Sequence, residues 1–174
     1  IIVAVLTIVT FKYVKDNDID IKEYIEESAT MKGTIGDTLS DKDVKITLTD
    51  ALIYPRIEGE AFTDTPAEGK EYLVFFFNVE NIDDENNFVS IHNFTGYVDD
   101  TLVASKILIN NVDNVQYLSA DLTPGKKTRG YVAYEVDTNW KQFDIHYKEN
   151  SFDYNDSMIF TVVNEENNQN NNNA

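Results

Sequence analysis

Three cations stand close together in a chain that is otherwise strongly acidic. Lys126, Lys127 and Arg129 fall in one short stretch, bracketed by Gly125 and Gly130. The 174-residue chain has only 14 Lys and Arg against 31 Asp and Glu, which gives a formal net charge of -17. A basic cluster between glycines can be the phosphate cradle of a P-loop, or it can be a turn between two strands.

The spacing of this stretch favours the turn. A P-loop has the pattern G-x-x-x-x-G-K-[ST] between a strand and a helix. Here Ala120 stands where the first glycine is required, and Lys127 stands where Ser or Thr is required. Pro124 and Gly125 instead fit the second and third positions of a type II turn, and an alternating strand pattern follows. We therefore expect the three cations to face solvent and to balance nearby carboxylates.

Two acidic stretches contain the oxygen ligands that calcium prefers. The first is similar to an EF-hand loop, with Asp16, Asp18 and Asp20 at its first, third and fifth positions and Glu27 at its twelfth. Its sixth position is Ile21, where an EF-hand needs glycine for the sharp turn. A solvated acidic stalk is therefore the favoured interpretation of this stretch.

The second acidic stretch is "NIDDENN", Asn81–Asn87, between two predicted strands. Asp83, Asp84 and Glu85 are its candidate metal ligands, and they define an alternative hypothesis in which Ca²⁺ stabilises a surface loop. The other interpretation is an ordinary turn, because Asn and Asp tolerate turn dihedral angles. The pair Asp99–Asp100 has the same two interpretations. Apart from this calcium alternative, the sequence indicates no cofactor.

Motifs for catalysis are absent from the sequence. The two histidines, His92 and His146, lie in separate predicted segments, and neither H-E-x-x-H nor G-x-S-x-G occurs. Because the chain has no cysteine, it has neither a thiol nucleophile nor a zinc–thiolate site. We therefore expect a protein that is not an enzyme and has no catalytic residues. A hydrolase whose site the sequence does not reveal is a second alternative.

The charge balance also limits the partners. Duplex nucleic acid is bound through Lys and Arg, which are scarce here. An acidic surface repels anionic lipid headgroups. We therefore expect no nucleic-acid partner and membrane contact only through the N-terminal segment. The expected partner is a protein or a ligand of the cell envelope.

The N-terminal segment bears on location. Residues 1–14, "IIVAVLTIVTFKYV", are apolar through Phe11. They are shorter than the roughly 20 residues that span a bilayer, and they predict a truncated membrane anchor or signal segment. A buried first strand is the alternative interpretation. Residues 15–32 predict an acidic stalk or short helix, so we expect an extracytoplasmic domain that is anchored to the cell membrane or secreted.

Residues 33–163 have the pattern of β-strands. Residues 43–51 alternate between apolar and polar, and the longer apolar stretch 71–81 predicts a central strand with both faces at least partly buried. About seven to eight short strands separated by turn signals predict an all-β, Ig-like antiparallel sandwich. Residues 164–174 are an Asn-rich, low-complexity tail that we expect to be disordered.

Five short stretches, in this order, are similar to a known family. They are Gly36–Asp37, Gly69–Val74, Val79–Asn81, Leu122–Lys126 and Gly130–Val136. They match the "G-D", "G-K-x-[YF]-L-V", "V-x-N", "L-x-P-G-K" and "G-x-V-x-[FY]-x-V" elements of an Ig-like extracytoplasmic domain family. Its members are largely uncharacterised surface lipoproteins and membrane-anchored proteins of Gram-positive bacteria, grouped with immunoprotective extracellular antigens.

The resemblance implies an Ig-like fold and a position outside the membrane, and it implies no reaction. Asp137 follows the last matching strand where many relatives have proline. The lipid-attachment cysteine of the lipoprotein members is absent, so anchoring would depend on the apolar N-terminus. The sequence therefore predicts a non-enzymatic cell-surface module that binds a protein or an envelope ligand.

Overall fold

The long strand β6 (Lys70–Asn81) forms because apolar residues occupy both of its faces, and it lies between two apolar clusters. One face carries Leu73, Phe75, Phe77 and Val79, and the other carries Tyr72, Val74 and Phe76. The first set belongs to the main core and the second set to a smaller cluster on the opposite side. The prediction of a central strand with both faces at least partly buried is therefore confirmed.

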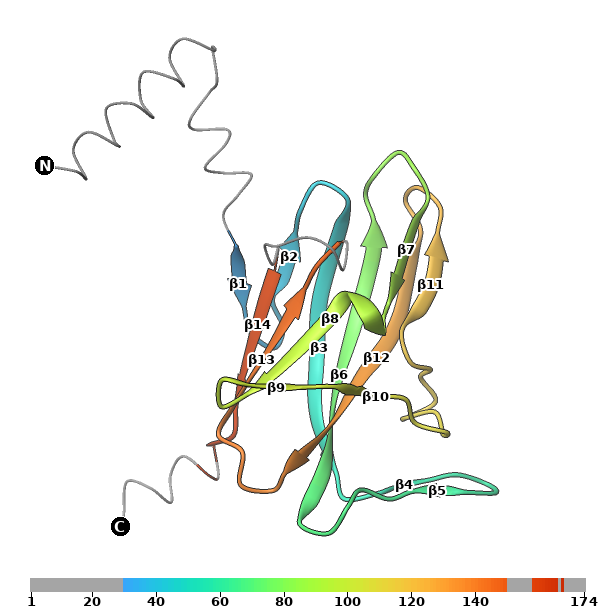
Figure 1. Cartoon of the computed structure of the whole chain (residues 1–174). Helices are drawn as coiled ribbons and strands as arrows, with labels where there is room; N and C mark the ends of the chain where they lie inside the picture. Colours follow the sequence, from blue (N-terminus) through green and yellow to red (C-terminus); the bar gives the residue numbers. More distant parts are fainter. Residues whose placement is uncertain (1–29, 150–157, 166, 168–174) are drawn as a thin grey trace, which may run out of the picture.

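The computed structural model describes residues 30–149, 158–165 and 167, which form a sandwich of two five-stranded sheets (Figure 1). The first, called the β6 sheet, has the order β10 (Ser105–Lys106), β12 (Lys127–Asp137), β6, β3 (Val44–Tyr54) and β2 (Thr38–Ser40). The second, called the β13 sheet, has the order β1 (Met31–Gly33), β14 (Met158–Val163), β13 (Gln142–Tyr147), β8 (Phe94–Val98) and β9 (Thr101–Val103).

Two small sheets extend this sandwich. They pair β7 (Asn87–Ser90) with β11 (Ser119–Leu122), and β4 (Ile57–Glu58) with β5 (Thr63–Asp64). A 3₁₀ helix, Ile91–Asn93, follows β7. Pairing within the two large sheets is antiparallel except between β1 and β14, which run parallel. The all-β sandwich predicted from the sequence is therefore correct.

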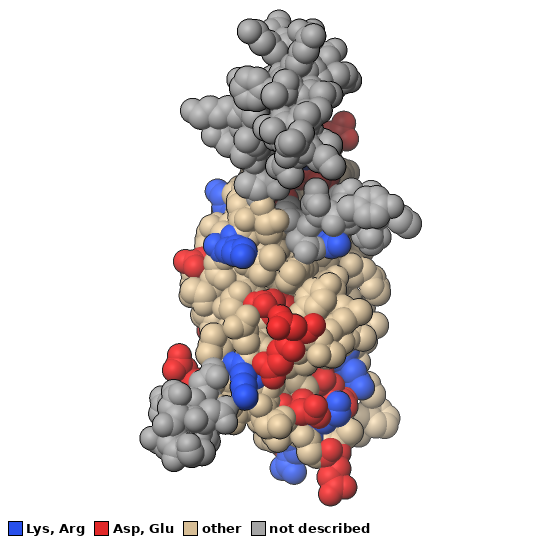
Figure 2. Space-filling model, turned by 60° about the vertical axis from the view of Figure 1, so that its left-hand side comes forward, with Lys and Arg blue, Asp and Glu red and all other residues tan. Residues whose placement is uncertain are grey.

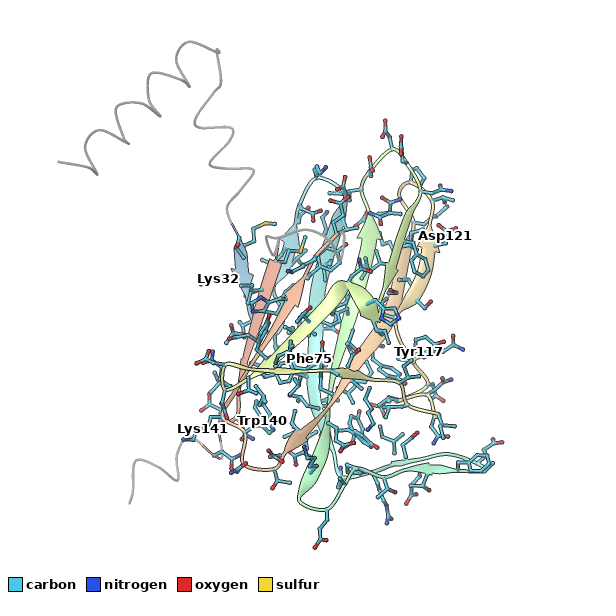
Figure 3. The ribbon with its side chains drawn as sticks, in the orientation of Figure 1. Lys32, Phe75, Tyr117, Asp121, Trp140 and Lys141 are labelled. Atoms are coloured by element: carbon cyan, nitrogen blue, oxygen red, sulfur yellow. The ribbon has the colours of Figure 1, made fainter. Side chains whose placement is uncertain are left out.

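An aromatic cluster fills the space between the two large sheets. The ring centroid of Phe75 lies 5.9 Å from that of Tyr134 and 4.9 Å from that of Phe143. Figure 3 shows Phe75 in the middle of the sandwich. Gly96, on β8, faces the same rings: an added Cβ would lie 2.5 Å from a ring atom of Tyr134 and 2.6 Å from one of Phe143. The absent side chain at this position therefore makes room for both rings.

The chain itself covers part of the outer face of the β6 sheet. Ile57, Leu108 and Val112 pack in the smaller apolar cluster on this face. The carboxylate of Asp64 fixes the part of this cover that contains Leu108 and Val112. It accepts hydrogen bonds from the backbone N–H of Asn110 at 2.9 Å and from the side-chain amide of Asn110 at 2.8 Å. This cover explains why β6 is apolar on both faces.

Two predicted turns are present in the structure. Asp99 and Asp100 connect β8 to β9 with φ values of 46° and 65°, the left-handed conformation of a tight hairpin turn. In the other turn, the backbone N–H of Lys126 donates to the carbonyl of Thr123 at 3.0 Å, and Gly125 has a φ of 73°. A positive φ at this third position fits the type II geometry expected from the sequence.

The structure differs from the sequence prediction in the number and limits of its strands. The described residues contain strands β1 to β14 rather than seven or eight, because many are too short to show an alternating pattern. Met31 and Lys32 belong to β1 rather than to the predicted stalk. At the other end, the side-chain amide of Asn167 donates to the carbonyls of Thr138 and Trp140 at 2.9 Å each. The folded unit therefore continues past the predicted sandwich boundary.

Several predicted segments lie outside the described residues. They are the apolar segment 1–14, the stalk through residue 29 and the end of the tail at 168–174. Within the part of the chain that is described, no helix is long and apolar enough to cross a membrane. The predicted anchor, stalk and EF-hand-like loop stay predictions.

Candidate functional site

A polar groove lies on the outer face of the β6 sheet, next to the smaller apolar cluster. Strands β3, β6 and β12 are neighbours here, so side chains on opposing residues form rows across the sheet. Lys45, Glu80 and Lys127 are direct cross-strand partners and form one row. The carboxylate of Glu80 lies 3.1 Å from Nζ of Lys127 and 3.9 Å from Nζ of Lys45.

The adjacent row consists of Thr47, Asn78 and Arg129, which are also cross-strand partners. The guanidinium of Arg129 lies over the ring of Phe76, with 5.6 Å between its Cζ and the ring centroid. Its nearest carboxylate is that of Asp50, at 3.9 Å. A cation–π contact of this kind favours a guanidinium that lies along the sheet.

These two rows line a groove of about 510 Å³, which we call the basic groove. The described residues that line it include three cations and one carboxylate, whereas the chain as a whole has a net charge of -17. All of these side chains project from paired strands, so the sheet fixes their positions more firmly than a loop would. The volume is within the range of sites that hold small ligands.

The structure divides the three cations of the predicted basic cluster between the groove and the turn before β12. Lys127 and Arg129 line the basic groove and face the carboxylates of Glu80 and Asp50, as predicted. Lys126 lies in the turn before β12 and does not line the groove.

Sequence reasoning missed the other residues of this groove, among them Lys45 and Asn78. Their strands precede β12 by tens of residues in the sequence. Strand alternation could have placed both on outward faces, but alternation does not reveal which strands pair or in what register.

A second groove, of about 430 Å³, lies on the outer face of the β13 sheet. The hydroxyl of Thr161 donates to the carboxylate of Asp144 at 2.6 Å. The ring of His146 lies 4.7 Å from that of Tyr97. Because the Thr161 hydroxyl donates to a carboxylate, it lacks the hydrogen bond to an imidazole base that activates a hydroxyl nucleophile.

The other histidine, His92, lies in the 3₁₀ helix, where its backbone N–H donates to the Ser90 hydroxyl at 3.3 Å. The two histidines therefore belong to different elements, as the sequence predicts.

On the face shown in Figure 2, Asp and Glu gather near the middle while Lys and Arg are spaced around them.

The predicted calcium residues Asp83, Asp84 and Glu85 lie in the loop between β6 and β7. A carboxylate oxygen of Asp83 accepts the backbone N–H of Asp84 at 2.7 Å, while the Glu85 carbonyl accepts the side-chain amide of Asn81 at 2.8 Å. These are the bonds of an ordered turn. Among the described residues, no group of three or more His, Cys, Asp or Glu is arranged to hold a metal ion. The calcium hypothesis stays a prediction.

Asp43, in the loop that precedes β3, and Glu149, which follows β13, form a carboxyl pair. Asp43 is buried, with 7% of its surface exposed, and its Oδ2 lies 3.6 Å from Nζ of Lys42. Burial, a hydrogen bond with Asp43 and the charge of Asp43 raise the pKa of Glu149 from 4.5 to about 7. The Glu149 carboxyl therefore retains its proton at a pH where a free glutamate is ionised. Sequence patterns give no indication of this contact, because its members are about a hundred residues apart.

Solved structures from several bacteria share this fold. A Bacillus subtilis protein named a "putative lipoprotein" has a TM-score of 0.60 and 14% identity, over 78% of this chain and 41% of that one. The secreted protein MPT63 of Mycobacterium tuberculosis has a TM-score of 0.53 and 13% identity, over 78% of this chain and 99% of that one. An uncharacterised β-sandwich protein of Clostridium difficile has a TM-score of 0.52 and 10% identity, over 78% of this chain and 95% of that one.

At these identities the likeness concerns the fold alone, and this chain spans less than half of the Bacillus subtilis protein. A search of curated protein sequences found no match. A family model described as "Domain of unknown function (DUF4352)" matches residues 33–169. This range contains every stretch on which the sequence resemblance was based. The chain therefore belongs to the DUF4352 family.

Proposed function

We propose that this protein is a non-enzymatic, Ig-like binding module on the outside of the cell, held there by its apolar N-terminal segment. The observation that carries the proposal is the basic groove, a solvent-facing site on a rigid sheet rather than a closed cavity. The lipoprotein and secreted-protein names of the structural neighbours support a location outside the cytoplasm. The two five-stranded sheets support the Ig-like classification.

The arrangement of the groove supports binding rather than catalysis. Among the described residues that line the groove, Glu80 is the one carboxylate, and it is paired with two lysines. Within the described part of the chain, no His, Ser or Tyr lines the groove. Its charged and amide groups are those that hold an anionic ligand in place.

Protease accessibility on intact cells tests the location. We expect protease added outside the cells to degrade the folded unit while a cytoplasmic marker protein in the same cells stays intact. Degradation only after lysis would contradict the proposal.

Binding at the groove is tested with the full chain immobilised and exposed to solubilised cell-envelope material. The comparison is with a variant in which Lys45, Lys127 and Arg129 are all replaced by Gln. We expect the wild-type chain to retain a component that the triple variant loses. Equal retention by both chains would place binding elsewhere on the molecule.

A further inference from the structure

We propose that the basic groove binds a small ligand through a terminal phosphate group. This inference rests on the proposed binding function and adds the chemistry of the ligand. It is carried by the two rows on β3, β6 and β12, which consist of Lys45, Glu80 and Lys127 and of Thr47, Asn78 and Arg129.

The cations of the groove are only partly neutralised. Nζ of Lys127 is within hydrogen-bond distance of Glu80, at 3.1 Å. Lys45 and Arg129 approach carboxylates only to 3.9 Å, beyond hydrogen-bond distance. An anion in the groove would gain hydrogen bonds from these groups without breaking a short ion pair. Exposed pairs at such separations contribute little to stability, so their loss would oppose binding weakly.

A phosphate monoester fits this arrangement better than a carboxylate does. It carries a charge of about −1.5 to −2 at neutral pH and three acceptor oxygens. The cations approach the groove from two sides, with Lys45 on β3 and both Lys127 and Arg129 on β12. Three oxygens can accept from three directions, whereas a carboxylate places both of its oxygens on one edge. The Asn78 amide, between the two sides, adds a neutral donor.

The charge of the rest of the chain indicates that the ligand is small. A long polyanion would extend from the groove over a surface with many more Asp and Glu than Lys and Arg, and it would be repelled. A compact phosphorylated molecule would contact the groove alone. The groove volume of about 510 Å³ is sufficient for such a molecule.

The test is an NMR titration of the ¹⁵N-labelled full chain in nonionic detergent with inorganic phosphate, and with acetate in parallel. We expect saturable shifts at the side-chain N–H groups of Asn78 and Arg129 with phosphate and much weaker shifts with acetate. Lys127→Gln and Arg129→Gln should each weaken phosphate binding by roughly five- to tenfold. Lys70→Gln is the matched control: Lys70 lies on the same sheet, pairs with Asp137 at 3.6 Å and is outside the groove.

Glu80→Gln tests the same proposal in the opposite direction. Removing this carboxylate takes away the negative charge that Lys45 and Lys127 face, so phosphate binding should tighten by a few-fold. The proposal is overturned if phosphate gives no saturable shift, if acetate binds as tightly, or if Lys70→Gln weakens binding as much as the groove variants do.

A phosphate monoester can belong to a soluble metabolite or to a lipid headgroup. Glycerol 1-phosphate and dihexanoyl phosphatidic acid, both used as dissolved monomers, distinguish these sources in the same titration. Tighter binding of the first supports a soluble ligand, and tighter binding of the second supports a lipid. If neither binds while the triple-Gln variant still loses the envelope component, the phosphate proposal fails and the proposed binding function stands.

Discussion

The side-chain amide of Asn81 donates a hydrogen bond of 2.7 Å to the carbonyl oxygen of Leu122. Asn81 ends β6 and is fully buried, and Leu122 precedes the turn at Gly125. The backbone of Asn81 contacts the same turn, because its N–H donates to the Lys126 carbonyl and its carbonyl accepts from the N–H of Gly125, each at 2.9 Å. The "V-x-N" and "L-x-P-G-K" stretches of the family are therefore joined in space.

Replacing Asn81 with Ala should lower the free energy of unfolding by about 2–4 kcal/mol. The substitution leaves the carbonyls of Leu122 and Glu85 without their shared donor. Urea denaturation monitored by circular dichroism measures the change. Asn78→Ala is the control on the same strand, since Asn78 is exposed, and it should change stability by less than about 0.5 kcal/mol. Equal effects at the two positions would contradict the role assigned to Asn81.

The fold was largely predictable because strand alternation depends on local sequence. Val44, Ile46 and Leu48 alternate with polar residues, and all three are buried in the main core. The cover over the outer face of β6 was not predictable. It depends on Leu108 and Val112, which lie in a segment without regular alternation, and on their distant contacts.

Gly96→Ala should destabilise the fold by about 1–3 kcal/mol through overpacking. The added methyl group would meet the rings of Tyr134 and Phe143 at distances too short for contact. The loss should be partly recovered in the double variant Gly96→Ala with Phe143→Leu, because the smaller side chain vacates space. Thermal unfolding of the single and double variants measures this coupling. Strictly additive losses would show that the methyl group is accommodated elsewhere.

Two tyrosines on β12 should respond in opposite ways to removal of their hydroxyl groups. The hydroxyl of Tyr131 donates to the carbonyl of Asn110 at 3.1 Å. That of Tyr134 is buried and has no hydrogen-bond partner within the described part of the chain. We expect Tyr131→Phe to lower the free energy of unfolding by about 1 kcal/mol and Tyr134→Phe to raise it by about 1 kcal/mol. Chemical denaturation of both variants checks the signs. A loss of stability in Tyr134→Phe would indicate that its hydroxyl is paired.

The candidate site was less predictable than the fold. The sequence indicates Lys127 and Arg129 because they are adjacent to other cations in an acidic chain. Lys45 joins them only through the register of β3 on β6, and a shift of one residue would turn its side chain to the opposite face. Composition alone does not supply this register.

Glu149→Gln should change how stability depends on pH. Burial and Asp43 raise the pKa of Glu149 in the folded protein from 4.5 to about 7. Below pH 4.5 the folded and unfolded chains both keep this proton. Between pH 4.5 and about 7 the unfolded chain releases this proton more readily than the folded chain does. The free energy of unfolding therefore falls as the pH rises through this range. The variant has no ionisable group at this position, so its free energy of unfolding does not fall for this reason.

The measurement is urea denaturation of wild type and Glu149→Gln at intervals between pH 4 and about 8. The stability of the variant relative to wild type should rise from pH 4.5 and level off once the pH exceeds 7. Glu68→Gln, at an exposed position on another loop, controls for the change in net charge. A difference between Glu149→Gln and wild type that does not vary with pH would mean that folding does not raise the pKa of Glu149. An equal pH-dependent rise in Glu68→Gln would assign the effect to overall charge rather than to this carboxyl pair.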